Sequence, residues 1–129
     1  PVDASFDTLY VLHGTGWKID DGRKIGQYRV HYSDGAVETI PIVYGRDVRN
    51  WQTNDDPLPT ARSVIAWTGQ NSFTRRYNAT VRLYLRVWHN PRPADHVTSI
   101  DFLSDNTRAA PFCVAMTIEQ SPQGTNDRR

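Results

Sequence analysis

Aromatic and planar polar side chains gather in three segments between predicted strands, residues 14–25, 45–61 and 89–96. Proteins bind sugars by stacking their C–H faces on aromatic rings and by hydrogen-bonding their hydroxyls to a few planar polar groups. The three segments supply both kinds of group, and we expect them to meet at one end of the fold. The candidate ligand-binding residues are Trp17, Arg46, Asp47, Trp51, Trp88, Asn90 and Arg92.

Each candidate also has a structural interpretation. Tryptophan is more often part of a core or a loop anchor than a ligand platform. Trp67, flanked by Ala66 and Thr68, is predicted to lie in the core. Arg46 and Asp47 are adjacent in the sequence and can equally pair with each other to brace their loop.

No catalytic motif accompanies these residues. The chain has no nucleophile elbow and no glycine-rich phosphate loop between a strand and a helix, so we expect a protein that is not an enzyme and needs no cofactor. No spacing of His, Cys and carboxylate side chains resembles a metal site. The acidic pairs Asp20-Asp21 and Asp55-Asp56 could hold a structural calcium ion, although solvated turns are the simpler interpretation of both.

Seven strands are predicted to position these segments. Apolar and polar residues alternate along short runs separated by loops rich in Gly, Pro, Asn and Asp, and no stretch of ten residues or more carries a helical period. This pattern is typical of an all-β antiparallel sandwich. Two strands form a hairpin around residues 33–35, and the other five span about residues 8–13, 62–68, 79–88, 97–103 and 112–119.

The hairpin has the clearest local signal. Apolar residues beginning at Tyr28 alternate with polar ones up to Asp34 and Gly35, which mark the turn. A two-residue loop would set Tyr28 opposite Pro41 and turn the isoleucines of the second strand to the polar face. A three-residue loop sets Tyr28 opposite Ile40 and keeps the apolar residues together. The second arrangement requires Gly35 to be left-handed, with a positive φ.

The same alternation predicts which face of each strand is buried. In the run 81–88 a purely apolar face alternates with one that carries two arginines, so we expect the apolar face to point inward. The residues predicted to be largely buried are Tyr28, Val30, Ile40, Val81, Leu83, Leu85, Phe102, Phe112, Val114 and Ile118.

Length and charge restrict the class of protein. The 129 residues suffice for one domain with a real core, which we place at residues 1–119, followed by a polar C-terminal tail at 120–129. Basic and acidic residues are mixed along the chain for a net charge of +1, which argues against nucleic acid as a partner. No apolar run approaches the length of a membrane span. Because the chain begins with Pro1, we expect it to be part of a longer protein.

Several strings of the sequence resemble a module known mainly from large multidomain bacterial proteins, especially those of the planctomycete type. The strings are LYVLHGTGW, IGQYRVHYSDGAVETIPIVYGRDVRNW, VIAWTG, RLYLRVWHNPRP and SIDFLSDNTRAAPFCVAMTIE, and they cover about residues 9–119. The module is similar to galactose-binding-domain-like jelly rolls, a fold common among carbohydrate-binding modules attached to hydrolases. The resemblance implies a jelly roll, an accessory role in a bacterial protein, and an extracytoplasmic or secreted location.

Two functions are expected from the residues and the resemblance together. The first is a non-catalytic carbohydrate-binding module that holds a glycan at one loop end. The alternative is a structural or protein-interaction module that uses the same loops, or a strand edge, to dock a neighbouring domain. An exposed aromatic platform beside a groove would favour the glycan, and a flat apolar patch would favour docking.

Overall fold

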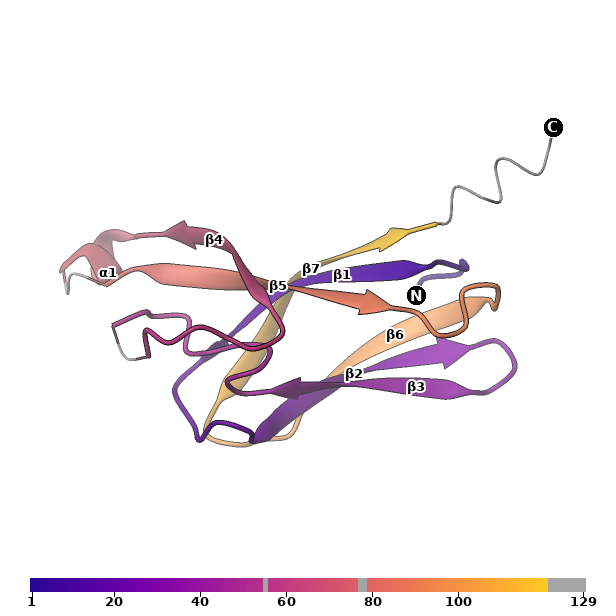
Figure 1. The fold of residues 1–129 in the computed structure, drawn as a ribbon, viewed down its shortest axis with the longest axis horizontal. Coiled ribbons are helices and arrows are strands. Elements are labelled where there is room, and N and C mark those ends of the chain that lie inside the picture. The colour runs from indigo at the N-terminus through magenta and orange to yellow at the C-terminus, as the bar shows by residue number, and fades with distance from the viewer. Residues whose placement is uncertain (55, 77–78, 121–129) are drawn as a thin grey trace.

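The computed structural model describes residues 1–54, 56–76 and 79–120, and it is all-β apart from one short helix (Figure 1). Its elements follow the chain in the order β1 (Thr8–Gly16), β2 (Lys24–Tyr32), β3 (Val37–Val43), β4 (Val64–Gly69), α1 (Ser72–Arg76), β5 (Val81–His89), β6 (Val97–Ser104) and β7 (Ala110–Glu119). The seven predicted strands are all present. Within the described residues, no helix is long and apolar enough to cross a membrane.

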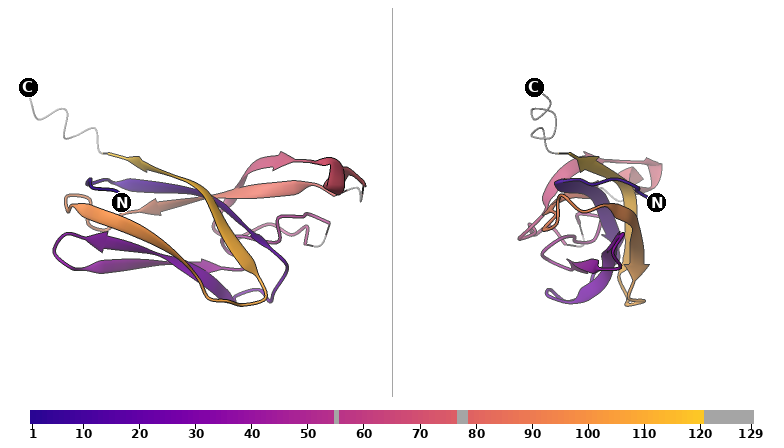
Figure 2. Two further views of the ribbon diagram at one scale, coloured as in Figure 1. Left: turned by 180° about the vertical axis from the view of Figure 1, so that it is seen from behind. Right: turned by 90° about the vertical axis from the view of Figure 1, so that its right-hand side faces the viewer.

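The strands form two antiparallel sheets with the core between them (Figures 1 and 2). The four-stranded sheet has the order β4-β5-β1-β7, and the three-stranded sheet has the order β3-β2-β6. A contact of 2.8 Å between Nδ1 of His13 on β1 and the hydroxyl of Tyr28 on β2 joins the two sheets across the core. The prediction of an all-β fold with antiparallel sheets is confirmed.

The β2–β3 hairpin has the three-residue loop that its apolar pattern predicted. Tyr28 lies opposite Ile40, and both side chains are buried. The amide of Tyr32 donates to the carbonyl of Ala36 at 2.9 Å, which closes the hairpin around the loop. Gly35 has a φ of 93°, as the left-handed turn position requires.

The core draws on both sheets and on the segments that flank them. Burying an aliphatic or aromatic side chain contributes roughly 1.5–3 kcal/mol, so this cluster is the main source of stability. Its fully buried apolar side chains include Phe6, Leu9, Val11, Ile25, Tyr28, Val30, Ile40, Ile42, Tyr44 and Tyr84.

The face of β5 that points toward the core is the one that the sequence predicted to lie outside. Directly opposite residues of paired strands share one face of a sheet, and Arg86 lies opposite Val11, which is buried in the core. Arg82 and Tyr84 lie on the same face of β5, and both are fully buried. The physical reason is that the guanidinium groups of this face find hydrogen-bond acceptors in the loop between β3 and β4.

The predicted set of buried residues is therefore wrong at several positions. Phe102 is 37% exposed because β6 is an edge strand. Val114 is exposed as the residue that the β1–β7 register skips at a bulge. Trp67, predicted to be core, is 50% exposed on the edge strand β4. The members of the set that are only half-buried are Leu83, Leu85, Phe112 and Ile118.

The loops also meet differently from the sequence-based expectation. β3 and β4 run in the same general direction, so the chain does not reverse between them (Figure 1). The loop after β5 therefore lies beside the hairpin turn, where Arg92 pairs with Asp34. The loop after β6 instead joins the loop after β1, and Lys24 pairs there with Asp105 at 3.1 Å. The expected meeting of residues 14–25 and 45–61 with residues 89–96 is wrong for the third segment.

We expect Gly35→Ala to lower the free energy of unfolding by about 1 kcal/mol. No atom lies within 4 Å of the place where the new Cβ would stand, so the loss would come from the left-handed backbone alone. Equilibrium urea unfolding measures it. Gly16→Ala is the control, because its Cβ would make an ordinary contact of 3.9 Å with Ala110 at a position without positive φ. Equal stability of wild type and Gly35→Ala would contradict the prediction.

Candidate functional site

Trp17, the first residue after β1, combines exposure with an uncommon backbone conformation. Its surface is 68% exposed, and its φ is 66°. A residue other than glycine in the left-handed region stores on the order of 1–3 kcal/mol of strain, and such strain clusters at ligand sites. Because the indole is largely exposed, it contributes little to the stability of the fold through burial. The position therefore marks a candidate site.

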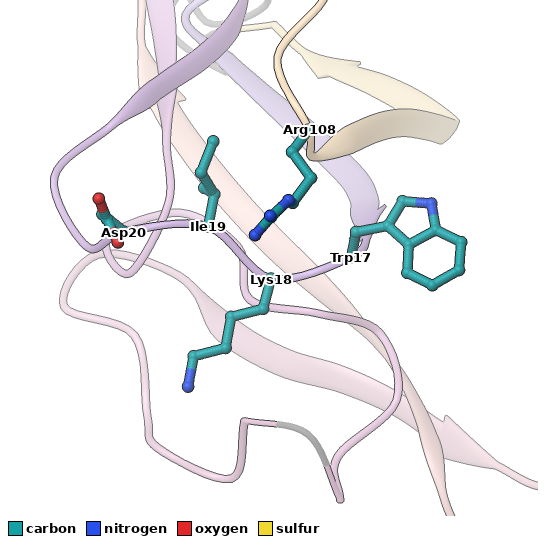
Figure 3. Close-up of a pocket in the computed structure, with 5 residues that line it drawn as sticks. All are labelled: Trp17, Lys18, Ile19, Asp20 and Arg108. Atoms are coloured by element: carbon teal, nitrogen blue, oxygen red, sulfur yellow. The ribbon is translucent and has the colours of Figure 1, made fainter.

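Two surface hollows share Trp17 in their lining, and Figure 3 shows the residues that line the larger one. The larger one, of about 530 Å³, is lined by Trp17, Lys18, Ile19, Asp20 and Arg108. Arg108 extends toward residues 17–20 from the loop before β7, and the indole of Trp17 projects away from the ribbon. The smaller hollow, of about 180 Å³, is lined by Gly16, Trp17, Asn50, Trp51 and Gln52.

Trp51 is held next to this position by backbone and ring contacts. Its amide donates to the carbonyl of Thr15 at 2.8 Å, and its carbonyl accepts from the amide of Arg82 at 2.8 Å. Its ring lies edge-on to Phe112, with 5.8 Å between the centroids. Trp51 is half-buried, so packing fixes part of the indole while the rest borders the smaller hollow together with Trp17.

Charged side chains of both signs line the larger hollow. Lys18 and Arg108 can donate hydrogen bonds and Asp20 can accept them, which matches the needs of a ligand rich in hydroxyls. Arg108 is absent from the predicted site because its loop, between β6 and β7, is not one of the three segments that were expected to meet. The pairing of Gly16 with Ala110 brings that loop to Trp17, and no local pattern in the sequence reports such a long-range contact.

Asp47 belongs to the loop between β3 and β4, and its buried side chain stabilises the fold. Its fully buried carboxylate accepts two hydrogen bonds from Arg62, both at 2.6 Å, and one from Arg86 at 2.8 Å. The amide of Val43 donates to the same carboxylate at 2.7 Å. Asp47 therefore braces its loop through Arg62 and Arg86 and not through Arg46, which is exposed.

A second ion cluster fastens the same loop to the β1–β2 loop. Arg49 donates to both carboxylate oxygens of Asp21 and to Asp56, each at 2.9 Å, and the hydroxyl of Tyr44 donates to Asp56 at 2.8 Å. Burial raises the pKa of Asp56, but these hydrogen bonds outweigh it and hold that pKa below its ordinary value.

The calcium sites considered from the sequence are not supported by this arrangement. Arg49 already binds Asp21 and Asp56, one acid from each predicted pair. Asp55 lies outside the described residues. Among the residues that are described, no group of three His, Cys or acidic side chains could hold a metal ion.

Three candidates from the sequence lie away from Trp17. Trp88 is half-buried on β5 and packs against the core. The side chain of Asn90 is buried and accepts a hydrogen bond from the hydroxyl of Tyr32. Arg92 lies over the ring of Tyr32, 4.4 Å from its centroid, and pairs with two aspartates. These contacts stabilise the end of the fold that carries the hairpin turn.

His13 lies within the core near the Asp47 cluster. Its Nδ1 contacts the hydroxyl of Tyr28, and its Nε2 has no hydrogen-bond partner among the described residues. Burial lowers the pKa of His13 to about 4, although the charge of Asp47 acts in the opposite direction. The imidazole is therefore neutral at pH 7.

No protein-family model, curated protein or solved structure matches this chain. The resemblance to galactose-binding-like modules stays a prediction from the sequence strings. Of the seven candidate residues, the structure brings Trp17 and Trp51 together beside the two hollows, and Arg46 is exposed on its loop. The four that hold the fold are Asp47, Trp88, Asn90 and Arg92.

We expect Asp47→Asn to lower the free energy of unfolding by about 3–5 kcal/mol, because it leaves the buried guanidinium of Arg86 without a counter-charge. Urea unfolding measures the loss. Asp105→Asn is the control, since its partner Lys24 is largely exposed and such pairs contribute about 0–1 kcal/mol. A loss for Asp47→Asn no larger than that of the control would show that the buried cluster does not brace the loop.

The depressed pKa of His13 predicts a loss of stability on acidification. Because the pKa is about 4 in the folded state and near the ordinary histidine value of 6.5 in the unfolded state, protonation favours unfolding as the pH falls from 6.5 toward 4. Between pH 7 and pH 4.5, the linked protonation of His13 should lower the free energy of unfolding by roughly 2–3 kcal/mol. His13→Gln should lose that part of the pH dependence in urea unfolding. Parallel pH profiles for the variant and wild type would contradict the assignment.

Proposed function

We propose that this chain is a non-catalytic carbohydrate-binding module and that its glycan binds at the loop end that carries Trp17. The observation behind the proposal is Trp17 itself, which is exposed, left-handed and common to two hollows. Strain at such a position persists only where the surrounding structure enforces it, which is the behaviour expected of a ligand platform.

The groups around Trp17 suit a small, well-hydrated ligand. The indoles of Trp17 and Trp51 offer apolar area on which the C–H face of a sugar ring can stack. Lys18, Asp20 and Arg108 offer donors and acceptors for its hydroxyls on the other side of Trp17. Both kinds of contact are needed, because the ligand loses its hydration and its freedom on binding.

The proposal also includes the finer assignments that the sequence strings imply. They are a jelly roll of the galactose-binding-like class, an accessory role in a larger bacterial protein, and an extracytoplasmic or secreted location. Two antiparallel sheets around one core support the class of fold. Recognition residues on loops that a rigid sheet scaffold positions support the binding role.

A glycan array on the isolated chain, followed by titration with the selected glycan, tests the proposal. Trp17→Ala and Trp51→Ala should each weaken binding roughly tenfold to a hundredfold, or ~1–3 kcal/mol, through the loss of stacking. Trp67→Ala is the matched control, because Trp67 is also half exposed but lies on β4 outside both hollows. It should bind like wild type.

Three results would contradict the proposal. If the array shows no bound glycan, the binding function is wrong. If both Trp17→Ala and Trp51→Ala are folded and bind like wild type, the site is wrong. Release of a cleaved product from any glycan would contradict the non-catalytic assignment.

An exposed apolar face favours a second function, the docking of a neighbouring protein domain. Val64, Trp67 and Val87 are exposed on the outer face of the four-stranded sheet. Val64 and Trp67 lie opposite Leu85 and Leu83, which are half-buried on that same face. Contiguous exposed apolar patches mark interaction surfaces. This function takes first place if no glycan binds.

A further inference from the structure

The larger hollow at Trp17 carries an excess of positive charge. It is lined by two basic side chains, Lys18 and Arg108, and by one acidic side chain, Asp20. All three are exposed, and none of them has a side-chain hydrogen bond or ion pair with another of the described residues. Both cations are therefore available to a ligand.

The other acids of the β1–β2 and β6–β7 loops are already neutralised by the fold. Asp21 accepts two hydrogen bonds from Arg49, both at 2.9 Å, and Asp105 pairs with Lys24 at 3.1 Å. Within these two loops, which the structure describes throughout, only Asp20 keeps a carboxylate without a cationic partner. The positive excess of the hollow is thus not offset by its surroundings.

Strand pairing fixes both ends of the loop that carries Arg108. Before it, the amide of Asp105 donates to the carbonyl of Ile25 at 2.9 Å. After it, Ala110 lies opposite Gly16 on β1. The guanidinium is therefore delivered to the hollow by a backbone that is held on both sides.

Figure 3 separates the two signs of charge within the hollow. The guanidinium of Arg108 lies between Ile19 and Trp17, whereas Asp20 lies beyond Ile19, away from the indole. A ligand group that sits beside Trp17 would therefore meet Arg108 and not Asp20.

The hollow lies at the far end of β1 and β7 from the two ends of the domain. Thr8 and Glu119 lie opposite each other where β1 begins and β7 ends, and Gly16 lies opposite Ala110 at the hollow. The nine residues of β1 span roughly 25–30 Å. The N-terminus also lies at the end away from the hollow (Figure 1).

We propose that the glycan bound here is acidic, an inference that rests on the proposed carbohydrate-binding function. A carboxylate or sulfate group of the sugar would pair with Arg108 while the sugar ring stacks on Trp17. The planar guanidinium binds such oxyanions through two parallel hydrogen bonds, and charge-assisted hydrogen bonds are about twice as strong as neutral ones. Lys18 would add a second, more mobile cation from the same hollow.

An acidic sugar suits this arrangement better than a nucleic acid does. Nucleic acids are bound by a patch or stripe of basic residues that follows many phosphates. The hollow offers two cations beside one exposed indole, which matches a single charged group on one stacked ring.

An array that carries neutral, uronate-bearing and sulfated oligosaccharides tests the inference on the intact chain. Acidic glycans should rank above neutral ones, and the uronate and sulfate arms identify which anionic group is bound. The best acidic binder is then titrated beside its neutral form, made by methyl esterification or desulfation. The acid should bind at least about tenfold more tightly. Added salt should reduce this preference, because it screens exposed charges.

Three variants assign the preference to the hollow. Arg108→Gln keeps hydrogen-bonding groups but removes the charge, so it should weaken binding of the acidic glycan about tenfold and of its neutral form less than about threefold. Asp20→Asn should strengthen binding of the acidic glycan about two- to threefold, because it removes the only like charge in the hollow. Arg75→Gln is the matched control, since Arg75 is exposed on α1 outside both hollows, and it should bind like wild type.

The outcomes separate this inference from the proposed function. A neutral glycan that binds best, and that Trp17→Ala weakens, would overturn the acidic class and leave the carbohydrate-binding function in place. An array without any bound glycan would overturn both. Equal effects of Arg108→Gln and Arg75→Gln, or equally strong competition by an oligothymidylate, would also overturn the inference. The ratio of acidic to neutral binding by wild type decides the question even if Arg108→Gln fails to fold.

Discussion

The buried carboxylate of Asp47 is the constraint on which the rest of the structure depends. It ties together the end of β3 through the amide of Val43, the loop just before β4 through Arg62, and the middle of β5 through Arg86. A buried charge without a partner costs several kcal/mol, so the loop cannot leave β5 without stranding Arg86. This one group therefore places the loop that carries Trp51 over the sheet.

The polar interior of β5 also determines what lies outside. Arg82 is fully buried and donates to the backbone carbonyls of Asn50 and Asp56, so its desolvation is compensated by the same loop. A strand has only two faces, and once its arginines point inward its leucines and Val87 must point outward. The exposed apolar face of the four-stranded sheet is thus a consequence of the loop chemistry, and not a separate feature.

These dependences explain which features could be predicted from the sequence. The hairpin register was predictable, because Tyr28, Ile40 and Gly35 lie within one short stretch whose alternation specifies one pairing. The inner face of β5 was not, because Arg86 and Asp47 are 39 residues apart and an unpaired arginine would belong outside. Of the candidate residues, Trp17 and Trp51 were named from local composition, and the structure places both beside one hollow. The two residues at the wrong end, Asn90 and Arg92, were misplaced because β4 continues the direction of β3.

The strain at Trp17 has an identifiable support. It follows β1, which is paired with β5 on one side and with β7 on the other, and Gly16 before it lies opposite Ala110. Two residues later, Ile19 packs against the core. The chain is thus held on both sides of Trp17, so the left-handed conformation is imposed and the indole has little backbone freedom to lose. Folding already fixes the backbone of Trp17, so a ligand that stacks on the indole would bind with little further loss of conformational entropy. Preorganisation of this kind raises affinity for a small ligand.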